Sequence, residues 1–143
     1  MVADSRVLLK PVVCFRESMS GPGDAPSMRT AISDVPWPDQ DGVLGYLRSG
    51  YVYGMTFGGM SGDHLEQSRR ITVDIDGEPQ PAGLLMTDGE YFWYSALIYY
   101  IDNYNLQVPD EFIEQARRHD WRVDLKTVSR ANYDFDFQAK SQV

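Results

Sequence analysis

The chain has 143 residues, of which 43% are hydrophobic and 24% charged, and its formal net charge is −8 at pH 7. This length suits one domain, and the composition is that of a folded globular protein, which excludes an intrinsically disordered chain. A strongly acidic surface repels phosphate backbones and anionic membranes, so we expect neither nucleic acid nor a membrane as a partner.

The cysteine content and the N-terminal run indicate the compartment. The single cysteine, Cys14, cannot form an internal disulfide, and one cysteine with two distant histidines offers no metal-binding pattern. Lys10 and Pro11 interrupt the first apolar run, which favours a strand over a signal peptide. No apolar stretch approaches the roughly 20 residues of a membrane span. We therefore expect a cytoplasmic protein with no metal and no cofactor.

The first part of the chain predicts a strand followed by a long loop. Residues 6–16 are rich in valine and leucine, and Pro11 would confine their strand to a sheet edge or a bulge. Residues 17–41 are rich in proline, glycine, serine and aspartate, which predicts a loop with one helical turn at 28–32. We expect Trp37 to pin this loop to the core.

The middle of the chain predicts one helix and several strands joined by tight turns. Asp76-Gly77 and Asp88-Gly89 are favoured turn pairs, and each stands between runs with strand character. We expect the strand over 71–75 to pair with the strand over 83–86. The expected elements are a helix over 39–49 and strands over 51–57, 71–75, 83–86 and 91–94.

Two helices and a short strand are expected next. Ser95 is a candidate N-cap for a helix that ends near Asn105, which can adopt the left-handed conformation. Pro109 marks the start of a second helix, which ends near His119. Alternation predicts a strand over 121–125 and, in residues 129–143, either another strand or a mobile tail. Together the elements predict a single α+β domain over 1–143, with an antiparallel sheet packed against a C-terminal helical hairpin.

Possible catalytic patterns have simpler structural explanations. Ser61 and His64 lack the spacing of a nucleophile elbow. The acids of 74–78 lack the remaining ligands of a calcium loop, and an Asp-Gly pair between strands is an ordinary hairpin turn. Tyrosines at helical spacing are typical of a core, although Tyr99 and Tyr100 are also suited to line a pocket. We therefore expect no enzymatic activity.

Acidic side chains on the predicted hairpins, with aromatic neighbours, suit a protein-binding surface. Aromatic residues anchor protein interfaces, and carboxylates steer a basic partner toward them. A solvated acidic face without a partner is an equally good explanation of the charges. The candidate contact residues are Tyr53, Phe57, His64, Asp74, Asp76, Glu78, Asp88, Glu90 and Tyr91.

A run of turn and helix residues follows a pattern: Thr-Asp-Gly, a tryptophan four residues after the glycine, Leu-x-Tyr-Tyr, and a closing Pro-x-Glu-Phe. Here these are Thr87-Asp88-Gly89, Trp93, Leu97, Tyr99-Tyr100, Pro109, Glu111 and Phe112. The run resembles a segment of small bacterial proteins of the polymorphic-toxin immunity type. It departs from that pattern at Tyr94 and Ala96, where a proline and an acid are expected. The resemblance implies a small α+β domain that blocks a toxin without catalysis.

The leading hypothesis is therefore an immunity protein that covers the active site of a cognate toxin, a basic nucleic-acid-modifying enzyme being one such partner. Two alternatives remain. One is a small enzyme or ligand-binding protein that uses a pocket lined by Tyr99, Tyr100 and His64. The other is a homodimeric interaction module that pairs through an exposed strand edge.

Overall fold

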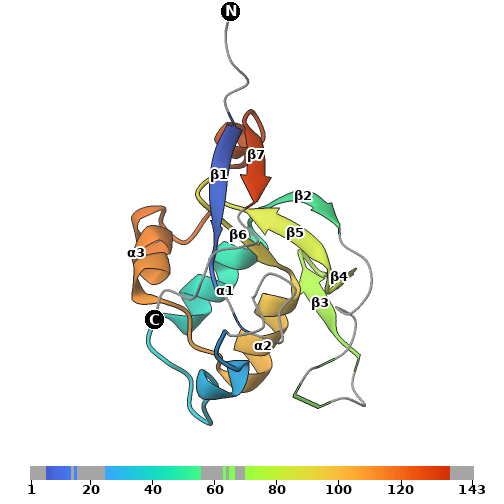
Figure 1. Ribbon diagram of the computed structural model, residues 1–143, viewed down its shortest axis with the longest axis vertical. Helices are drawn as coiled ribbons and strands as arrows, with labels where there is room; N and C mark the ends of the chain where they lie inside the picture. Colours follow the sequence, from blue (N-terminus) through green and yellow to red (C-terminus); the bar gives the residue numbers. More distant parts are fainter. Residues whose placement is uncertain are drawn as a thin grey trace, which may run out of the picture.

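The computed structural model describes residues 6–13, 15, 25–55, 63, 65–66 and 70–135, and these residues form an α+β fold (Figure 1). The main sheet has five strands in the order β2-β5-β6-β1-β7, and a separate hairpin pairs β3 with β4. The strands are β1 (Arg6–Pro11), β2 (Tyr51–Met55), β3 (Thr72–Ile75), β4 (Glu78–Pro81), β5 (Leu84–Thr87), β6 (Tyr91–Tyr94) and β7 (Asn132–Phe135). The helices are η1 (Met28–Thr30), α1 (Gln40–Arg48), α2 (Ala96–Tyr104), α3 (Asp110–Arg118) and α4 (Leu125–Val128).

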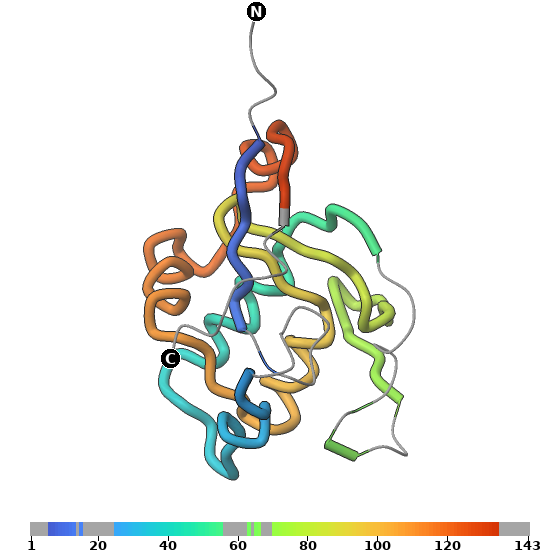
Figure 2. Tube along the Cα trace, in the orientation of Figure 1, coloured from blue at the N-terminus to red at the C-terminus, as the bar shows by residue number. Residues whose placement is uncertain are grey.

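The main sheet is mixed, so the prediction of an antiparallel sheet is only partly right. β2, β5 and β6 pair antiparallel, whereas β1 runs parallel to both β6 and β7. Figure 2 shows the first and last strands of the described chain side by side, although they lie at opposite ends of the sequence. Turn chemistry specifies only the pairing of strands that follow each other, so these parallel pairs left no local signal.

Pro11 does not place β1 at a sheet edge, because β1 lies between β6 and β7. The backbone nitrogens of Lys10 and Val12 donate to Glu90 and Phe92 beside β6. Backbone groups alternate along a strand, so the nitrogen of Pro11 faces the β7 side. The described pairing with β7 ends at Leu9, before Pro11. The proline therefore removes no described ladder hydrogen bond.

The strand over 72–75 pairs with β4 and not with residues 83–86, so the predicted hairpin partner is wrong. Asp76 and Gly77 have positive φ values of 55° and 80°. A two-residue turn with both φ values positive returns the chain at once, which pairs Ile75 with Glu78. Residues 84–87 instead form the buried strand β5, between β2 and β6.

The predicted C-terminal helical hairpin is only partly matched, because a third helix packs against both of its members. α1 contacts both α2 and α3, and Figure 1 shows it between them. The buried side of α1 carries Val43, Leu44, Tyr46 and Leu47. This apolar face needs partners on both sides, so it separates α2 from α3.

Local signals placed most helix ends correctly. Asn105 has φ 53° and ends α2 in the left-handed conformation, and α3 starts directly after Pro109. Ser95 is not a hydrogen-bonding N-cap: its hydroxyl donates to the carbonyl of Pro81 at 2.6 Å and accepts from the nitrogen of Leu84 at 3.1 Å. The predicted strand over 121–125 is wrong, because the side chain of Asp124 caps the short helix α4.

The core forms around α2 and the central strands. All six residues from Ala96 to Ile101 are buried, and so are all four residues of β6. Trp37 is half-buried, and its indole N–H donates to the carbonyl of Leu106 at 3.1 Å, which fastens the loop after η1 as predicted. Within the described part of the chain, no helix is both long enough and apolar enough to cross a membrane.

Candidate protein-binding site

The β3–β4 hairpin stands apart from the main sheet and carries a concentrated negative charge (Figure 1). Asp74 and Asp76 are exposed, as the alternation predicts, and Glu78 is exposed as well, whereas Val73 is 3% exposed and faces α2. Residues 71–81 contain no lysine or arginine. No ion pair to these three carboxylates occurs within the described residues, so their charge faces solvent.

The outer edge of β4 is closed to another strand. Ile75 and Glu78 flank the two-residue turn and exchange both backbone hydrogen bonds in such a hairpin, so Pro79 and Pro81 fall at positions whose nitrogens point away from β3. Proline offers no N–H, so this edge lacks the donors that an added strand would need. A partner of the hairpin must therefore be bound through side chains.

The hairpin is fastened to the helical layer by Arg48, the last residue of α1. Its Nε donates to the backbone carbonyl of Asp74 at 3.1 Å, and its Nη2 lies 3.9 Å from a carboxylate oxygen of Asp102 on α2. Asp102 thus joins the neighbourhood of the hairpin acids, a role that no sequence signal indicated. The guanidinium of Arg48 binds the backbone carbonyl of Asp74, so the carboxylate of Asp74 remains exposed to solvent.

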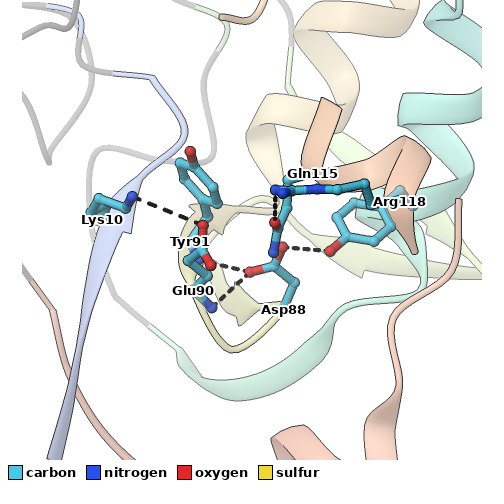
Figure 3. Close-up of polar contacts among 7 residues, drawn as sticks. Lys10, Asp88, Glu90, Tyr91, Gln115 and Arg118 are labelled. Carbon is cyan, nitrogen blue, oxygen red and sulfur yellow. Dashed lines mark hydrogen bonds and ion pairs between the residues drawn. The ribbon is translucent and has the colours of Figure 1, made fainter. Parts of the chain in front are cut away.

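Asp88 does not belong to this exposed surface, which corrects its predicted role. It is only 7% exposed, and its Oδ1 accepts hydrogen bonds from the backbone nitrogens of Glu90 and Tyr91 at 2.9 and 2.7 Å. Its Oδ2 accepts from the hydroxyl of Tyr46 at 2.5 Å. Figure 3 shows these bonds converging on the carboxylate. Asp88 therefore organises the β5–β6 turn.

Tyr91 is also buried, at 8% exposure, so it is not the exposed anchor that was expected. Its ring packs edge-on against Phe112, with centroids 5.1 Å apart, and the ammonium of Lys10 lies 4.8 Å from the ring centroid. Burial, and then the charge of Glu90, raise the pKa of its hydroxyl. The sequence did not reveal that Phe112, from a separate helix, covers this ring.

The other polar side chains around the β5–β6 turn form contacts within the protein. Glu90 is exposed, and its carboxylate lies 3.9 Å from the ammonium of Lys10 (Figure 3). Arg118 donates to the side-chain carbonyl of Gln115 at 2.7 Å. Burial, and then the nearby charge of Asp88, raise the pKa of Tyr46, so this hydroxyl stays protonated and serves as a donor.

The remaining predicted contact residues lie elsewhere. Tyr53 is 39% exposed on β2, and its ring packs against Tyr133 of β7. Phe57 and His64 lie outside the described residues. Of the candidates that the structure describes, Asp74, Asp76 and Glu78 lie on the β3–β4 hairpin, and Tyr53, Asp88, Glu90 and Tyr91 lie on or beside the main sheet.

The helix with clustered tyrosines lies in the core. Tyr99 and Tyr100 are 7% and 5% exposed, and Tyr99 donates to the carboxylate of Asp63 at 2.8 Å. The same carboxylate accepts from Tyr104 at 2.6 Å and from two backbone nitrogens, and is itself 1% exposed. No group of three or more histidine, cysteine or acidic side chains suited to a metal ion occurs within the described ranges.

Comparison with known proteins brought no relative: no family model, no curated protein and no solved structure matches this chain. Its function has to be inferred from its own residues and their geometry.

Proposed function

We propose that this protein binds and blocks a cognate bacterial toxin, and that the β3–β4 hairpin is the contact surface. The supporting observation is the hairpin itself: Asp74, Asp76 and Glu78 are each exposed at or near its turn without a described counter-charge, on an element whose outer edge at β4 is closed. Carboxylates attract a basic partner over long range and increase the rate of association.

A basic nucleic-acid-modifying enzyme is the class of toxin that this surface fits best. Such an enzyme binds phosphates with lysine and arginine, and a group of carboxylates can occupy the same positive site. The hairpin presents its three acids within five residues, on a turn of fixed geometry. Little ordering of the hairpin backbone would then be needed on binding.

The resemblance to immunity-type proteins concerns residues that maintain the fold and says little about the surface that contacts a toxin. Of the shared residues, Trp93, Leu97, Tyr99, Tyr100 and Phe112 are all buried. Core residues of this kind maintain a fold, while exposed residues select a partner. The shared pattern is thus compatible with an inhibitor whose contact surface is its own.

Binding to the protein encoded beside this gene tests the proposal. We expect the two proteins to co-purify, and the toxin activity to be lost in the complex. The contact is tested with the neutral triple variant Asp74→Asn, Asp76→Asn and Glu78→Gln, which preserves side-chain shape. Its association rate should fall by about tenfold at low salt, and the dependence of that rate on salt should weaken.

A matched control removes the same charge on another part of the surface. Asp34→Asn, Asp110→Asn and Glu111→Gln alter three exposed acids outside the hairpin. Their association rate should change much less than that of the hairpin variant. If both variants associate equally slowly, the effect comes from the net charge of the protein, and the hairpin is not the specific contact surface. Absence of any complex would remove the proposed function as a whole.

A further inference from the structure

The strand β1 is paired on both sides over only part of its length. Lys10 and Pro11 pair with β6, whereas Arg6 to Leu9 pair with β7 alone. In Figure 1, β1 and β7 extend beyond the other strands, and no strand is drawn beside this half of β1 on the side away from β7. Among the strands that the structure describes, the first half of β1 is therefore an open edge.

Leu8 directs its backbone groups toward that open side. The nitrogens of Lys10 and Val12 donate to the carbonyls of Glu90 and Phe92, at 3.1 and 3.0 Å, so even-numbered residues face β6. Alternation along the strand places the N–H and C=O of Leu8 on the same side. Within the described residues they have no backbone partner there, because the chain turns away at Gly89.

Three other strand edges in the described part of the chain, those of β4, β7 and β2, are closed or interrupted. Pro79 and Pro81 remove the donors of β4, as described above. The outward-facing nitrogen of Tyr133 on β7 donates to the hydroxyl of Tyr53, at a long 3.5 Å. A register shift interrupts β2 between Val52 and Gly54. Such features are what proteins use to prevent edge pairing, and the described residues place none of them at Leu8.

The side chains beside the open edge of β1 are apolar or basic. Leu8 is 59% exposed and Val7 42% exposed, so both apolar side chains meet solvent. Arg6 and Lys10 project on the same face as Leu8. Their ion pairs with Asp134 and Glu90 are exposed, with separations of 3.3 and 3.9 Å, and pairs of this kind stabilise weakly.

We propose that this open edge, Arg6 to Leu9, binds an extended segment of a partner protein by strand addition. An extended backbone is the ligand that meets the N–H and C=O of Leu8 at strand spacing. The segment places an apolar side chain against Leu8 and carboxylates toward Arg6 and Lys10. This contact does not depend on the acidic hairpin or on the identity of the toxin.

A peptide titration followed by nuclear magnetic resonance tests the inference. The probes are a short synthetic peptide with the sequence Glu-Thr-Val-Thr-Glu, which places glutamate, valine and glutamate on one face of a strand, and its counterpart in which lysine replaces glutamate. The acidic peptide should shift the backbone amide signal of Leu8 and slow its hydrogen exchange, and it should bind several-fold tighter than the basic one. An unchanged Leu8 amide would overturn strand addition, and equal binding of both peptides would overturn the acidic preference.

Two variants examine the edge by different means. Leu8→Pro removes the N–H on the open side and leaves the hydrogen bonds to β7 in place, so a folded variant should lose peptide binding. Leu8→Glu keeps the backbone and repels the acidic peptide, which should weaken its binding by about tenfold. Leu125→Glu makes the same change at another exposed leucine, 49% exposed on α4, and should bind as the unaltered protein does. Unweakened binding by Leu8→Glu would contradict the proposal even if Leu8→Pro failed to fold.

Discussion

The ring of Tyr53 on β2 packs edge-on against the ring of Tyr133 on β7, with centroids 5.6 Å apart and an interplanar angle of 75°. β2 and β7 are the two outer strands of the five-stranded sheet. The contact therefore brings the two edges of the sheet together, and the Tyr53 hydroxyl accepts from the nitrogen of Tyr133. The sheet is curled, and this pair holds its edges.

Substitutions at Tyr53 should separate the ring contact from the hydrogen bond. Among the contacts described for Tyr53, the substitution Tyr53→Phe removes the long hydrogen bond and keeps the ring, so it should lower the free energy of unfolding by less than about 1 kcal/mol. Tyr53→Ala also removes the ring contacts with Tyr133 and Tyr51, which should cost about 1 kcal/mol more. Urea denaturation gives both values. If amide exchange at Tyr133 is no faster in Tyr53→Ala, this pair does not hold the edges together.

Two glycines of α1 should respond to alanine in opposite directions. A Cβ at Gly42 would lie 2.8 Å from the ring of Trp121, whereas a Cβ at Gly45 would meet nothing within 4 Å. Gly45→Ala should raise the free energy of unfolding by about 0.5–1 kcal/mol, because alanine favours a helix. Gly42→Ala gains the same propensity but forces the indole to move, so we expect a net loss. Thermal unfolding of the two variants measures the difference, and a stabilised Gly42→Ala would show that Trp121 relocates freely.

The hydroxyl of Tyr46 should matter more than that of another buried tyrosine. Tyr46→Phe leaves the buried carboxylate of Asp88 with one donor fewer, which should cost about 1.5–3 kcal/mol. Tyr94 is also buried, at 7% exposure, and its hydroxyl has no hydrogen bond among the described residues. Tyr94→Phe should therefore change the free energy of unfolding by less than about 0.5 kcal/mol. Equal effects of the two substitutions, measured by urea denaturation, would argue against a structural role for the Asp88 contact.

Asp63 should make the protein sensitive to acid. Burial alone would raise the pKa of its carboxyl, but hydrogen bonds from Tyr104, Tyr99 and two backbone nitrogens outweigh burial and lower it. The unfolded chain then binds more protons than the folded one as the pH falls. The stabilisation is complete above the ordinary pKa of about 3.9 and is lost as the pH falls through the lower folded value.

The variant Asp63→Asn tests this sign. Both tyrosine hydroxyls donate to Oδ2 and both backbone nitrogens donate to Oδ1, and the single amide oxygen of asparagine can replace only one of these acceptors. The variant should therefore unfold more easily at neutral pH, and the dependence of its stability on pH below about 4 should be weaker. Urea denaturation across pH 2–7 provides the comparison. A variant with the acid sensitivity of the unaltered protein would place the responsible carboxyl elsewhere.

Part of the candidate site could be predicted from the residues alone. The alternation that starts at Ile71 was enough to predict that the side chains of Asp74 and Asp76 are exposed. The Asp76-Gly77 pair was enough to predict a tight turn. Asp88 and Tyr91 carry the same local signals but are buried, because Tyr46 and Phe112 come from distant elements to cover them. Asp102 was missed because Arg48, from a different helix, connects it to the carbonyl of Asp74.

The same division applies to the fold. Turn pairs, the left-handed Asn105 and Pro109 act over a few neighbouring residues, so they located the β5–β6 turn and the ends of α2 and α3 correctly. The parallel pairing of β1 with β7 and the place of α1 between two helices join residues far apart in the chain. Those arrangements follow from how all the apolar faces are buried at once, a condition that no single segment contains.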